Sequence, residues 1–176
     1  METRIRPASH ADLPAILAIY NEVIANTTAA YVYEPHTLDM RTKWFNDLKA
    51  GGWPVIVSDN DGTIMGFGCI GVFRSKPGYK YTGEHTVYVH ADHRGKGVGH
   101  ALLSALIEEA KLLELRTLIG GIDSANSASI AFHASFGFTE CARMKDVAYK
   151  FGRWLDLVFM QLVLPGPRKP KEGDRR

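Results

Sequence analysis

The stretch "HADHRGKGVGHALL", residues 90–103, joins a glycine-rich segment to an apolar helical pattern. Its centre holds three glycines and two cations, which are Gly95, Gly97, Gly99, Arg94 and Lys96. Glycines ahead of a helix leave backbone N–H groups open, and the helix dipole favours negative charge there. The stretch therefore predicts an anion-binding turn between a strand and a helix, although a tight turn without a ligand would use the same glycines.

Two well-known phosphate loops do not fit this spacing. A P-loop needs a glycine separated by four residues from Gly-Lys, followed by Ser or Thr, whereas this chain has His90 and Gly97 at those two places. The dinucleotide fingerprint GxGxxG finds its first two glycines at Gly97 and Gly99 but meets Leu102 in the third place. The P-loop is therefore excluded and the dinucleotide loop is disfavoured.

Hydrophobic periodicity and turn residues predict the elements before the stretch. We expect a strand at 3–6, a helix that starts at Ser9 with Asp12 as its capping partner, and a second helix from Thr37 or Asp39 to Leu48. The apolar face of the first helix should consist of Leu13, Ile16, Leu17, Tyr20 and Ile24. Apolar runs at 54–58 and 63–74 flank "DNDG", the signal of a short hairpin turn.

The same reasoning predicts the elements around and after the stretch. They are a strand at 81–90, a helix with Val98, Ala101, Leu102, Ala105 and Leu106 on one face, a strand at 116–122, a helix at 127–136, and strands at 138–150 and 153–164. A strand, a helix and a strand in succession form a β-α-β unit. The order predicts an α+β fold with that unit near the centre of the sheet.

Composition limits the class of protein. A hydrophobic share of 45% and a charged share of 23% are those of a globular domain, and we expect one domain at 1–165 with a disordered tail at 166–176. The tail carries five of the cations and the body is close to neutral, so the basic face of a nucleic-acid binder is missing. No apolar run is long enough to span a bilayer, and the chain starts without a signal-like segment. We expect a cytoplasmic protein that binds neither nucleic acid nor membrane.

The two cysteines, Cys69 and Cys141, lie far apart in the chain, without a CxxC motif or a histidine cluster at metal-binding spacing. We therefore expect two buried thiols and no metal site.

Two signatures together resemble the GNAT superfamily of acetyl-CoA-dependent N-acetyltransferases. Arg94, Gly97 and Gly99 match a segment that follows the fourth strand in that family, and Asn126 with "FHASFGF" (residues 132–138) matches the downstream helix and its Gly-Phe closure. Within the family, residues 74–99 and 149–162 resemble the phosphinothricin and methionine sulfoximine or sulfone acetyltransferase branch. The resemblance implies a mixed, mostly antiparallel, twisted sheet flanked by helices, with the fourth and fifth strands splayed apart.

The resemblance also implies where acetyl-CoA binds. Backbone amides of the glycine-rich segment would hold the pyrophosphate, and amides of the splayed fourth strand would hold the thioester carbonyl and the pantetheine arm. The implied cofactor-binding residues are Val87, Tyr88, Val89, Arg94, Gly95, Lys96, Gly97, Val98, Gly99, Asn126 and Ser135. Ser135 is equally well explained as an exposed serine.

Two residues are candidates for proton transfer. Glu84 lies in an apolar strand, where burial would raise its pKa, and the resemblance places a base at this position that would deprotonate the acceptor amine. An exposed position on the sheet is the alternative. Many family members have a tyrosine as general acid for the coenzyme thiolate at the place of His133, and an imidazole can take that role near neutral pH or simply pack on its helix.

A further group of residues is expected to form the acceptor pocket. The guanidinium of Arg74 could bind a substrate carboxylate in a bidentate pair, with a solvated loop arginine as the alternative. In a regular strand His85 points away from Glu84, but Gly83 permits a bulge that would turn both toward one site. The full set of expected substrate-binding residues is Phe73, Arg74, Ser75, Glu84, His85 and Thr86, with Tyr31, Tyr33 and Trp44 either as pocket walls or as core.

The expected activity is transfer of acetyl to the α-amine of a small amino acid such as methionine sulfoximine, methionine sulfone or phosphinothricin. Acetylation of protein N-termini or lysines, and a non-catalytic acetyl-CoA-binding module, remain alternatives. The resemblance further suggests a homodimer.

Overall fold

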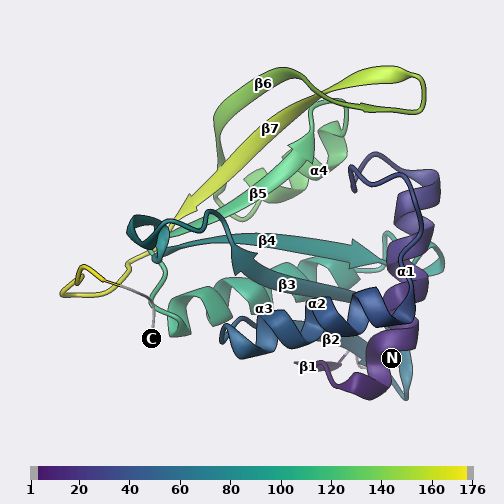
Figure 1. The fold of residues 1–176 in the computed structure, drawn as a ribbon, viewed down its shortest axis with the longest axis horizontal. Coiled ribbons are helices and arrows are strands. Elements are labelled where there is room, and N and C mark those ends of the chain that lie inside the picture. Colours follow the sequence, from purple (N-terminus) through teal and green to yellow (C-terminus); the bar gives the residue numbers. More distant parts are fainter. Residues whose placement is uncertain (1–3, 174–176) are drawn as a thin grey trace. The chain divides into compact units, whose positions relative to one another are not determined.

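The computed structural model describes residues 4–173, and the order of its elements is the predicted one (Figure 1). The strands are β1 Arg4–Pro7, β2 Val55–Asn60, β3 Thr63–Val72, β4 Thr82–Val89, β5 Thr117–Asp123, β6 Thr139–Lys150 and β7 Arg153–Val163. The α-helices are α1 Leu13–Asn26, α2 Leu38–Ala50, α3 Val98–Leu112 and α4 Ser127–Ala134.

Hydrogen bonding orders the strands β1-β2-β3-β4-β5-β7-β6. The pairs β1–β2, β2–β3, β5–β7 and β6–β7 are antiparallel, and β4–β5 is parallel, as the connection through α3 requires. The β4–β5 ladder pairs Thr82 to Glu84 with Thr117 to Ile119, and β5 then continues to Asp123 in its pairing with β7. The expected α+β fold with a mixed, mostly antiparallel sheet is confirmed.

The chain divides into two compact units. The first consists of the chain up to Gly71 together with Thr86–Glu108, and the second consists of Val72–His85 together with the chain from Glu109 onward. The boundary cuts β4 between His85 and Thr86. The expectation of a single domain at 1–165 stays a prediction.

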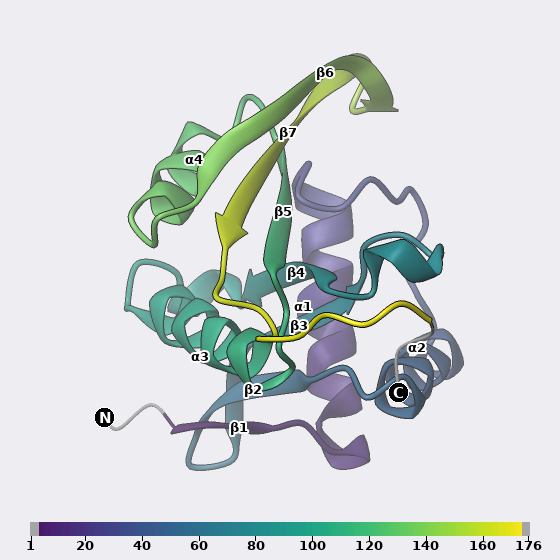
Figure 2. The ribbon, with the colours of Figure 1, turned by 90° about the vertical axis from the view of Figure 1, so that its left-hand side faces the viewer.

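In the first unit helices cover both faces of β2 and β3. Val57 and Phe67 are paired across the two strands and point into an apolar core with Ile16 of α1 and Phe45 of α2. Gly66 and Gly68 point to the opposite face, where an added Cβ would meet Val98, Leu102 and Leu106 of α3. Figure 2 shows α3 and α2 on opposite sides of these strands. The glycines let α3 approach the sheet closely, which positions the start of α3.

Local signals predicted the start of α2 and the capping box at Ser9, but Ser9 begins a 3-10 turn, His10–Asp12, and α1 itself begins only at Leu13. The Asp12 carboxylate accepts hydrogen bonds from the Ser9 N–H and hydroxyl at 2.8 and 2.9 Å, and the Thr37 hydroxyl accepts one from Met40 N–H at 3.2 Å. Thr37, and not Asp39, is therefore the N-cap of α2. The expected face of α1 was only partly right, because Leu17 and Tyr20 are half-buried whereas the buried set is Leu13, Ile16, Ile19, Val23 and Ile24.

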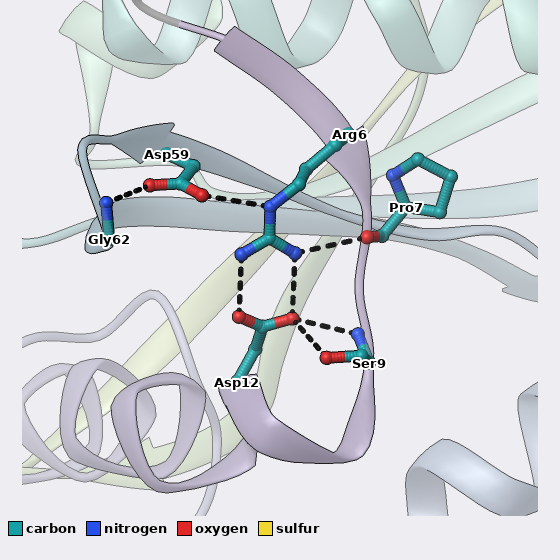
Figure 3. Close-up of polar contacts among 6 residues, drawn as sticks. All are labelled: Arg6, Pro7, Ser9, Asp12, Asp59 and Gly62. Atoms are coloured by element: carbon teal, nitrogen blue, oxygen red, sulfur yellow. Dashed lines mark hydrogen bonds and ion pairs between the residues drawn. The ribbon is translucent and has the colours of Figure 1, made fainter.

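Hydrogen bonds from the Arg6 side chain connect β1 to the residue before α1 and to the β2–β3 turn. Figure 3 shows its guanidinium between Asp12 and Asp59, with three nitrogen–oxygen distances of 2.8 Å. Asp59 also accepts the Gly62 N–H of the turn at 2.8 Å. Hydrogen bonding to Arg6 lowers the pKa of the Asp12 carboxyl to about 2, so the network stays charged well into the acid range.

The second unit is built on β5, β7 and β6, with α4 packed beside them (Figure 2). Phe151 and Gly152, both at positive φ, make the turn that joins β6 to β7. Side chains along this hairpin remain exposed although they are apolar: Met144, Val147, Tyr149, Phe151 and Trp154.

Three expectations about the rest of the chain have different outcomes. Cys69 is buried as expected, but the expectation for Cys141 was wrong, since this residue is exposed on β6, the last strand of the sheet. In the tail, the Lys171 N–H donates to the Tyr81 hydroxyl at 3.0 Å, and disorder at 166–176 stays a prediction. Within residues 4–173, no helix is long and apolar enough to cross a membrane, and the cytoplasmic location stays a prediction.

Candidate active site

The glycine-rich segment forms the loop that leads into α3 in the first unit. Gly95 and Gly97 adopt φ values of 73° and 82°, which side chains other than glycine rarely adopt. Gly99 lies inside the first turn of the helix, and the first bond within α3 runs from the Ala101 N–H to the Gly97 carbonyl at 3.0 Å. The N–H groups of Val98 and Gly99 precede this bond and lie at the positive end of α3.

The surroundings of this loop leave room for an anion. A Cβ added at Gly95 or Gly97 would meet no atom within 4 Å, so the space beside the loop backbone is open. Lys96 is exposed next to these glycines and can add positive charge. An open backbone at the N-terminus of a 15-residue helix is a suitable donor set for phosphate oxygens.

Arg94, which was expected to bind the coenzyme, makes contacts within the first unit. Its guanidinium forms an ion pair with Glu22 of α1 at 2.7 Å and donates to the Val89 carbonyl at 3.3 Å. These contacts tie the loop to α1 and to the end of β4. Arg94 therefore shapes the loop, and a direct contact with the coenzyme remains a prediction.

The end of β4 in the first unit supplies the other expected coenzyme contacts. Val87, Tyr88 and Val89 are half-buried, and the Tyr88 ring packs against Tyr20 and Phe67 at centroid distances of 5.5 and 5.4 Å. The Thr86 hydroxyl lies 3.2 Å from the Cys69 sulfur. The side chains of Tyr88 and Thr86 thus make contacts inside the unit, and any contact with the coenzyme would come from the backbone.

The second unit contains Glu84, whose carboxylate is half-buried. A Cβ added at Gly121 would lie 3.5 Å from Glu84 Oε1, 3.5 Å from Leu157 and 3.7 Å from Phe159, so these side chains share one face of β5 and β7. Burial raises the pKa of the Glu84 carboxyl above its ordinary value. A carboxylate with a raised pKa beside apolar side chains has the properties of a general base.

Arg74 is connected to this group of side chains through its neighbour Phe73. The Phe73 ring contacts Phe159 at a centroid distance of 6.2 Å, and the Arg74 guanidinium lies 5.3 Å from the Phe73 ring. Arg74 is exposed, as is Ser75, and within residues 4–173 no carboxylate forms an ion pair with Arg74. The second unit therefore links a cation free to bind a carboxylate with a possible base, through Phe73 and Phe159.

His85 points away from Glu84, as a regular strand requires. A Cβ added at Gly120, the neighbour of Gly121, would lie 2.8 Å from the His85 ring. His85 is 3% exposed, and its Nε2 lies 3.0 Å from Nε2 of His133 on α4. The structure thus brings His85 together with His133 and separates it from Glu84, and a substrate contact by His85 is not supported by this position.

His133 has both ring nitrogens engaged. Its Nδ1 donates to the Ser129 carbonyl at 2.7 Å, while its Nε2 meets His85. Burial lowers the pKa of the imidazole below its ordinary value. A role as general acid would require the ring to exchange one of these partners for the thiolate.

The two remaining coenzyme candidates lie at opposite ends of α4. Asn126 is the N-cap, and its side-chain oxygen accepts the Ser129 N–H at 3.0 Å. Ser135 is exposed and its hydroxyl donates to the Phe132 carbonyl at 2.7 Å. Both have structural explanations, and their coenzyme contacts stay predictions.

The aromatic residues named as pocket or core have different environments. Tyr31 and Tyr33 are exposed, whereas Trp44 is half-buried and packs on Phe67 at 6.1 Å. Sequence reasoning missed Gly120 and Phe159, which shape the surroundings of His85 and Glu84. The "GG" at 120–121 was visible in the sequence, but only the structure shows which side chain each glycine faces.

Between residues 4 and 173, no three His, Cys, Asp or Glu side chains are arranged to hold a metal ion.

Comparison with known proteins agrees with the geometry. Residues 5–159 match the family model "Acetyltransferase (GNAT) domain". An L-methionine sulfoximine/L-methionine sulfone acetyltransferase of Salmonella typhimurium is 46% identical over 160 residues, covering 91% of this chain and 94% of the relative.

Two solved structures also match over nearly the whole chain. A GNAT superfamily phosphinothricin acetyltransferase from Sinorhizobium meliloti, in complex with acetyl-CoA, has a TM-score of 0.92 and 34% identity, and the match covers 98% of this chain and 94% of that one. A ribosomal-protein-alanine N-acetyltransferase from Brucella melitensis has a TM-score of 0.90 and 45% identity, with coverage of 92% and 99%. On the family model, the close relative and the shared fold, the chain belongs to the GNAT acetyltransferase family.

Proposed function

We propose that this N-acetyltransferase transfers the acetyl group of acetyl-CoA directly to the α-amine of a small amino-acid analogue of the methionine sulfoximine, methionine sulfone or phosphinothricin type. The observation that carries the proposal is the group formed by Glu84, Phe159, Phe73 and Arg74 in the second unit. It offers one base and one free cation around apolar side chains. An amino-acid acceptor needs these two groups for its amine and its carboxylate.

Glu84 is the proposed base. An α-amine is mostly protonated at neutral pH, so it becomes a nucleophile only after losing a proton. Burial raises the pKa of the Glu84 carboxyl and so brings it closer to the pKa of the protonated amine, which makes the proton transfer less unfavourable. The amine nitrogen then bonds to the thioester carbonyl carbon, the C–S bond breaks, and the departing thiolate takes up a proton.

Arg74 is the proposed carboxylate-binding residue. A guanidinium can bind a carboxylate through two parallel N–H···O bonds, and the Phe73 ring beneath it restricts its orientation. Phe73 and Ser75 flank it in the same loop. His85 and Thr86 remain candidates for the substrate side only through the backbone, because their side chains are engaged elsewhere.

Acetyl-CoA supplies the acetyl group and leaves as the free thiol. The residues proposed to hold it are the loop from Arg94 to Gly99, the backbone of Val87, Tyr88 and Val89, and Asn126 and Ser135 at the two ends of α4. His133 is the proposed proton donor to the thiolate. We propose that the reaction needs no metal.

A second candidate function is acetylation of a protein N-terminus. It is favoured by the similarity to the Brucella melitensis structure, whose name gives a ribosomal-protein alanine as the acceptor. A peptide acceptor would not need the free cation of Arg74 for a carboxylate next to the reacting amine. A comparison of amino acids with short peptides as acceptors therefore separates the two functions.

We also propose that the protein is a homodimer that associates through the β6–β7 hairpin. Val147, Tyr149, Phe151 and Trp154 are 40, 47, 57 and 60% exposed there, and such a group of apolar side chains is typical of an association surface. Sedimentation of the unsubstituted chain and of Trp154→Glu tests this. The proposal predicts a dimer that the substitution converts to a monomer.

The test of the function is release of coenzyme A thiol with a panel of acceptors: methionine sulfoximine, methionine sulfone, phosphinothricin, common amino acids and short peptides. We expect turnover with the first three. Glu84→Gln should lower kcat by about 100-fold or more, because a positioned base contributes 10²–10⁴ in rate. Glu108→Gln, which alters an exposed carboxylate on α3, is the matched control and should retain the activity.

Arg74→Gln provides the second test. It should raise KM for methionine sulfone and leave KM for acetyl-CoA unchanged. Turnover confined to peptides would contradict the small acceptor, and full activity of Glu84→Gln would contradict its role as base.

A further inference from the structure

A chain of hydrogen-bonded groups runs through the buried His85–His133 pair in the second unit. His85 Nδ1 lies 2.9 Å from the Ile119 carbonyl oxygen, the two Nε2 atoms are 3.0 Å apart, and His133 Nδ1 lies 2.7 Å from the Ser129 carbonyl oxygen. The chain begins and ends at carbonyl oxygens, which can only accept. It therefore contains three contacts, each of which needs one proton.

Two neutral imidazoles supply only two protons. If both Nδ1 atoms donate to their carbonyls, the two Nε2 lone pairs face each other at 3.0 Å. If one ring carries its proton on Nε2 instead, its Nδ1 lone pair faces a carbonyl oxygen at 2.9 or 2.7 Å. Every neutral arrangement thus leaves two acceptors in contact inside the protein, which is unfavourable.

Other arrangements of the rings do not remove this conflict. The Ser129 hydroxyl could donate to His133 Nδ1, but its distance of 3.5 Å is much longer than the 2.7 Å to the carbonyl of the same residue. Turning the His133 ring by 180° would place carbon atoms against both of its present partners and lose two hydrogen bonds. A third proton would satisfy all three contacts.

We propose that His85 and His133 share one extra proton between their Nε2 atoms, so that the pair is a single imidazole–imidazolium unit with one positive charge. His85 is then a positioning residue that fixes the orientation and the proton of His133. The two protons on Nδ1 stay with their carbonyls, and the third lies on the line between the rings.

The surroundings favour one charge over two. Burial, and then repulsion by His133, lower the pKa of His85 to about 3, so a second extra proton stays off the pair. Burial also opposes the first, but the charge is met by the carbonyl oxygens of Ile119 and Ser129 at the two ends of the pair. A hydrogen bond to a charged group is about twice as strong as a neutral one.

Between residues 4 and 173, no other ionisable group makes a hydrogen bond, ion pair or ring contact with the pair. Strand β5 contributes the Ile119 carbonyl and Gly120, helix α4 contributes Ser129 and Phe132, and Phe138 lies just before β6. Glu84, the neighbour of His85 in β4, lies on the opposite face beside Gly121. Titration of the pair therefore reports the shared proton itself.

This inference rests on the proposed function only for the role of the proton, which is to protonate the departing coenzyme thiolate. When His133 donates it, an N–H bond breaks and the S–H bond of coenzyme A forms. The pair is left with two facing lone pairs, and it regains a proton from water. The shared proton is a property of the free protein and can be measured without any acceptor.

The experiment is nitrogen-15 and proton NMR of the full chain labelled at histidine, at neutral pH. We expect one strongly downfield proton resonance that correlates with two Nε2 atoms. It should be present in the unsubstituted chain and in the control His10→Gln, which removes an exposed histidine, and absent in His85→Gln and His133→Gln. Nitrogen-15 shifts typical of two neutral imidazoles in the unsubstituted folded chain would overturn the proposal. This measurement does not depend on whether the variants fold.

A kinetic readout distinguishes positioning from a purely structural role. His85→Gln keeps an N–H donor toward His133 Nε2 but cannot hold the extra proton, whereas His85→Leu removes both. We expect the alkaline limb of the kcat–pH profile to shift in both variants, with KM for acetyl-CoA unchanged. An unshifted kcat–pH profile in a folded His85→Gln variant would show that the pair does not share a catalytic proton. If the unsubstituted chain has no turnover with any acceptor, the proposed function is refuted, but the shared proton is not.

Discussion

The most direct structural perturbation near the His85–His133 pair is Gly120→Ala. The new methyl group would lie 2.8 Å from His85 Cε1 and 3.3 Å from Nε2 of both His85 and His133, closer than carbon atoms normally approach. His85 cannot easily move away, because it is 3% exposed and its Nδ1 is bonded to Ile119 at 2.9 Å. Overpacking of this kind costs about 1–3 kcal/mol, and breaking the contact between the rings adds to it.

Gly121→Ala is the matched control one residue away. Its methyl group would meet Glu84, Leu157 and Phe159 at 3.5–3.7 Å, which is ordinary contact. Urea unfolding of both variants measures the difference. We expect Gly120→Ala to lower the free energy of unfolding by about 1–3 kcal/mol. Gly121→Ala should stay within about 1 kcal/mol of the unsubstituted chain, because alanine makes the unfolded state less flexible and this offsets small losses in the folded state. Equal free energies of unfolding would refute the close approach of His85 to Gly120.

Three further predictions concern other parts of the chain. The pKa of Asp12 is about 2 when folded against an ordinary 3.8, so the Arg6 pair contributes about 2 kcal/mol that is present above pH 4 and lost as pH falls toward 2; acid unfolding of Asp12→Asn should lack this loss. Gly97→Ala should weaken acetyl-CoA binding in calorimetry, because φ there is 82°. Cys141 should react with a thiol reagent in the folded protein and Cys69 only after unfolding, as mass spectrometry would show.

Much of the fold could be predicted because its signals are local. The Ser9–Asp12 capping box, the Thr37 cap and the Asp61-Gly62 turn depend on residues within a few positions of one another. Such patterns determine backbone conformation without the rest of the chain. The order of the elements followed from them.

Burial was predicted less well because it depends on distant contacts. The face of α1 was assigned from spacing alone, whereas Ile19 packs into the core beside Phe45 and Val23 packs in a second cluster with Ala30. Cys141 was expected to be buried, but it is exposed because β6 lies at the edge of the sheet. The sequence of β6 itself does not reveal this edge position.

The candidate site shows the same division. The glycine-rich loop and the raised pKa of Glu84 could be expected from sequence and resemblance. The pairing of His85 with His133 could not, because 48 positions separate them and only the packing of α4 brings the rings together. The sequence therefore indicated which residues could carry protons, and the structure shows which of them exchange hydrogen bonds.

The central claim is that the acetyl group passes to the α-amine of a small amino acid. Acetyl-CoA labelled with carbon-13 at the carbonyl, incubated with the protein and methionine sulfone, tests it most directly when the product is identified by NMR and mass spectrometry. We predict α-N-acetyl-methionine sulfone in an amount equal to the thiol released. Thiol release without an acetylated amino acid, or label found only on peptides offered in competition, would contradict the account.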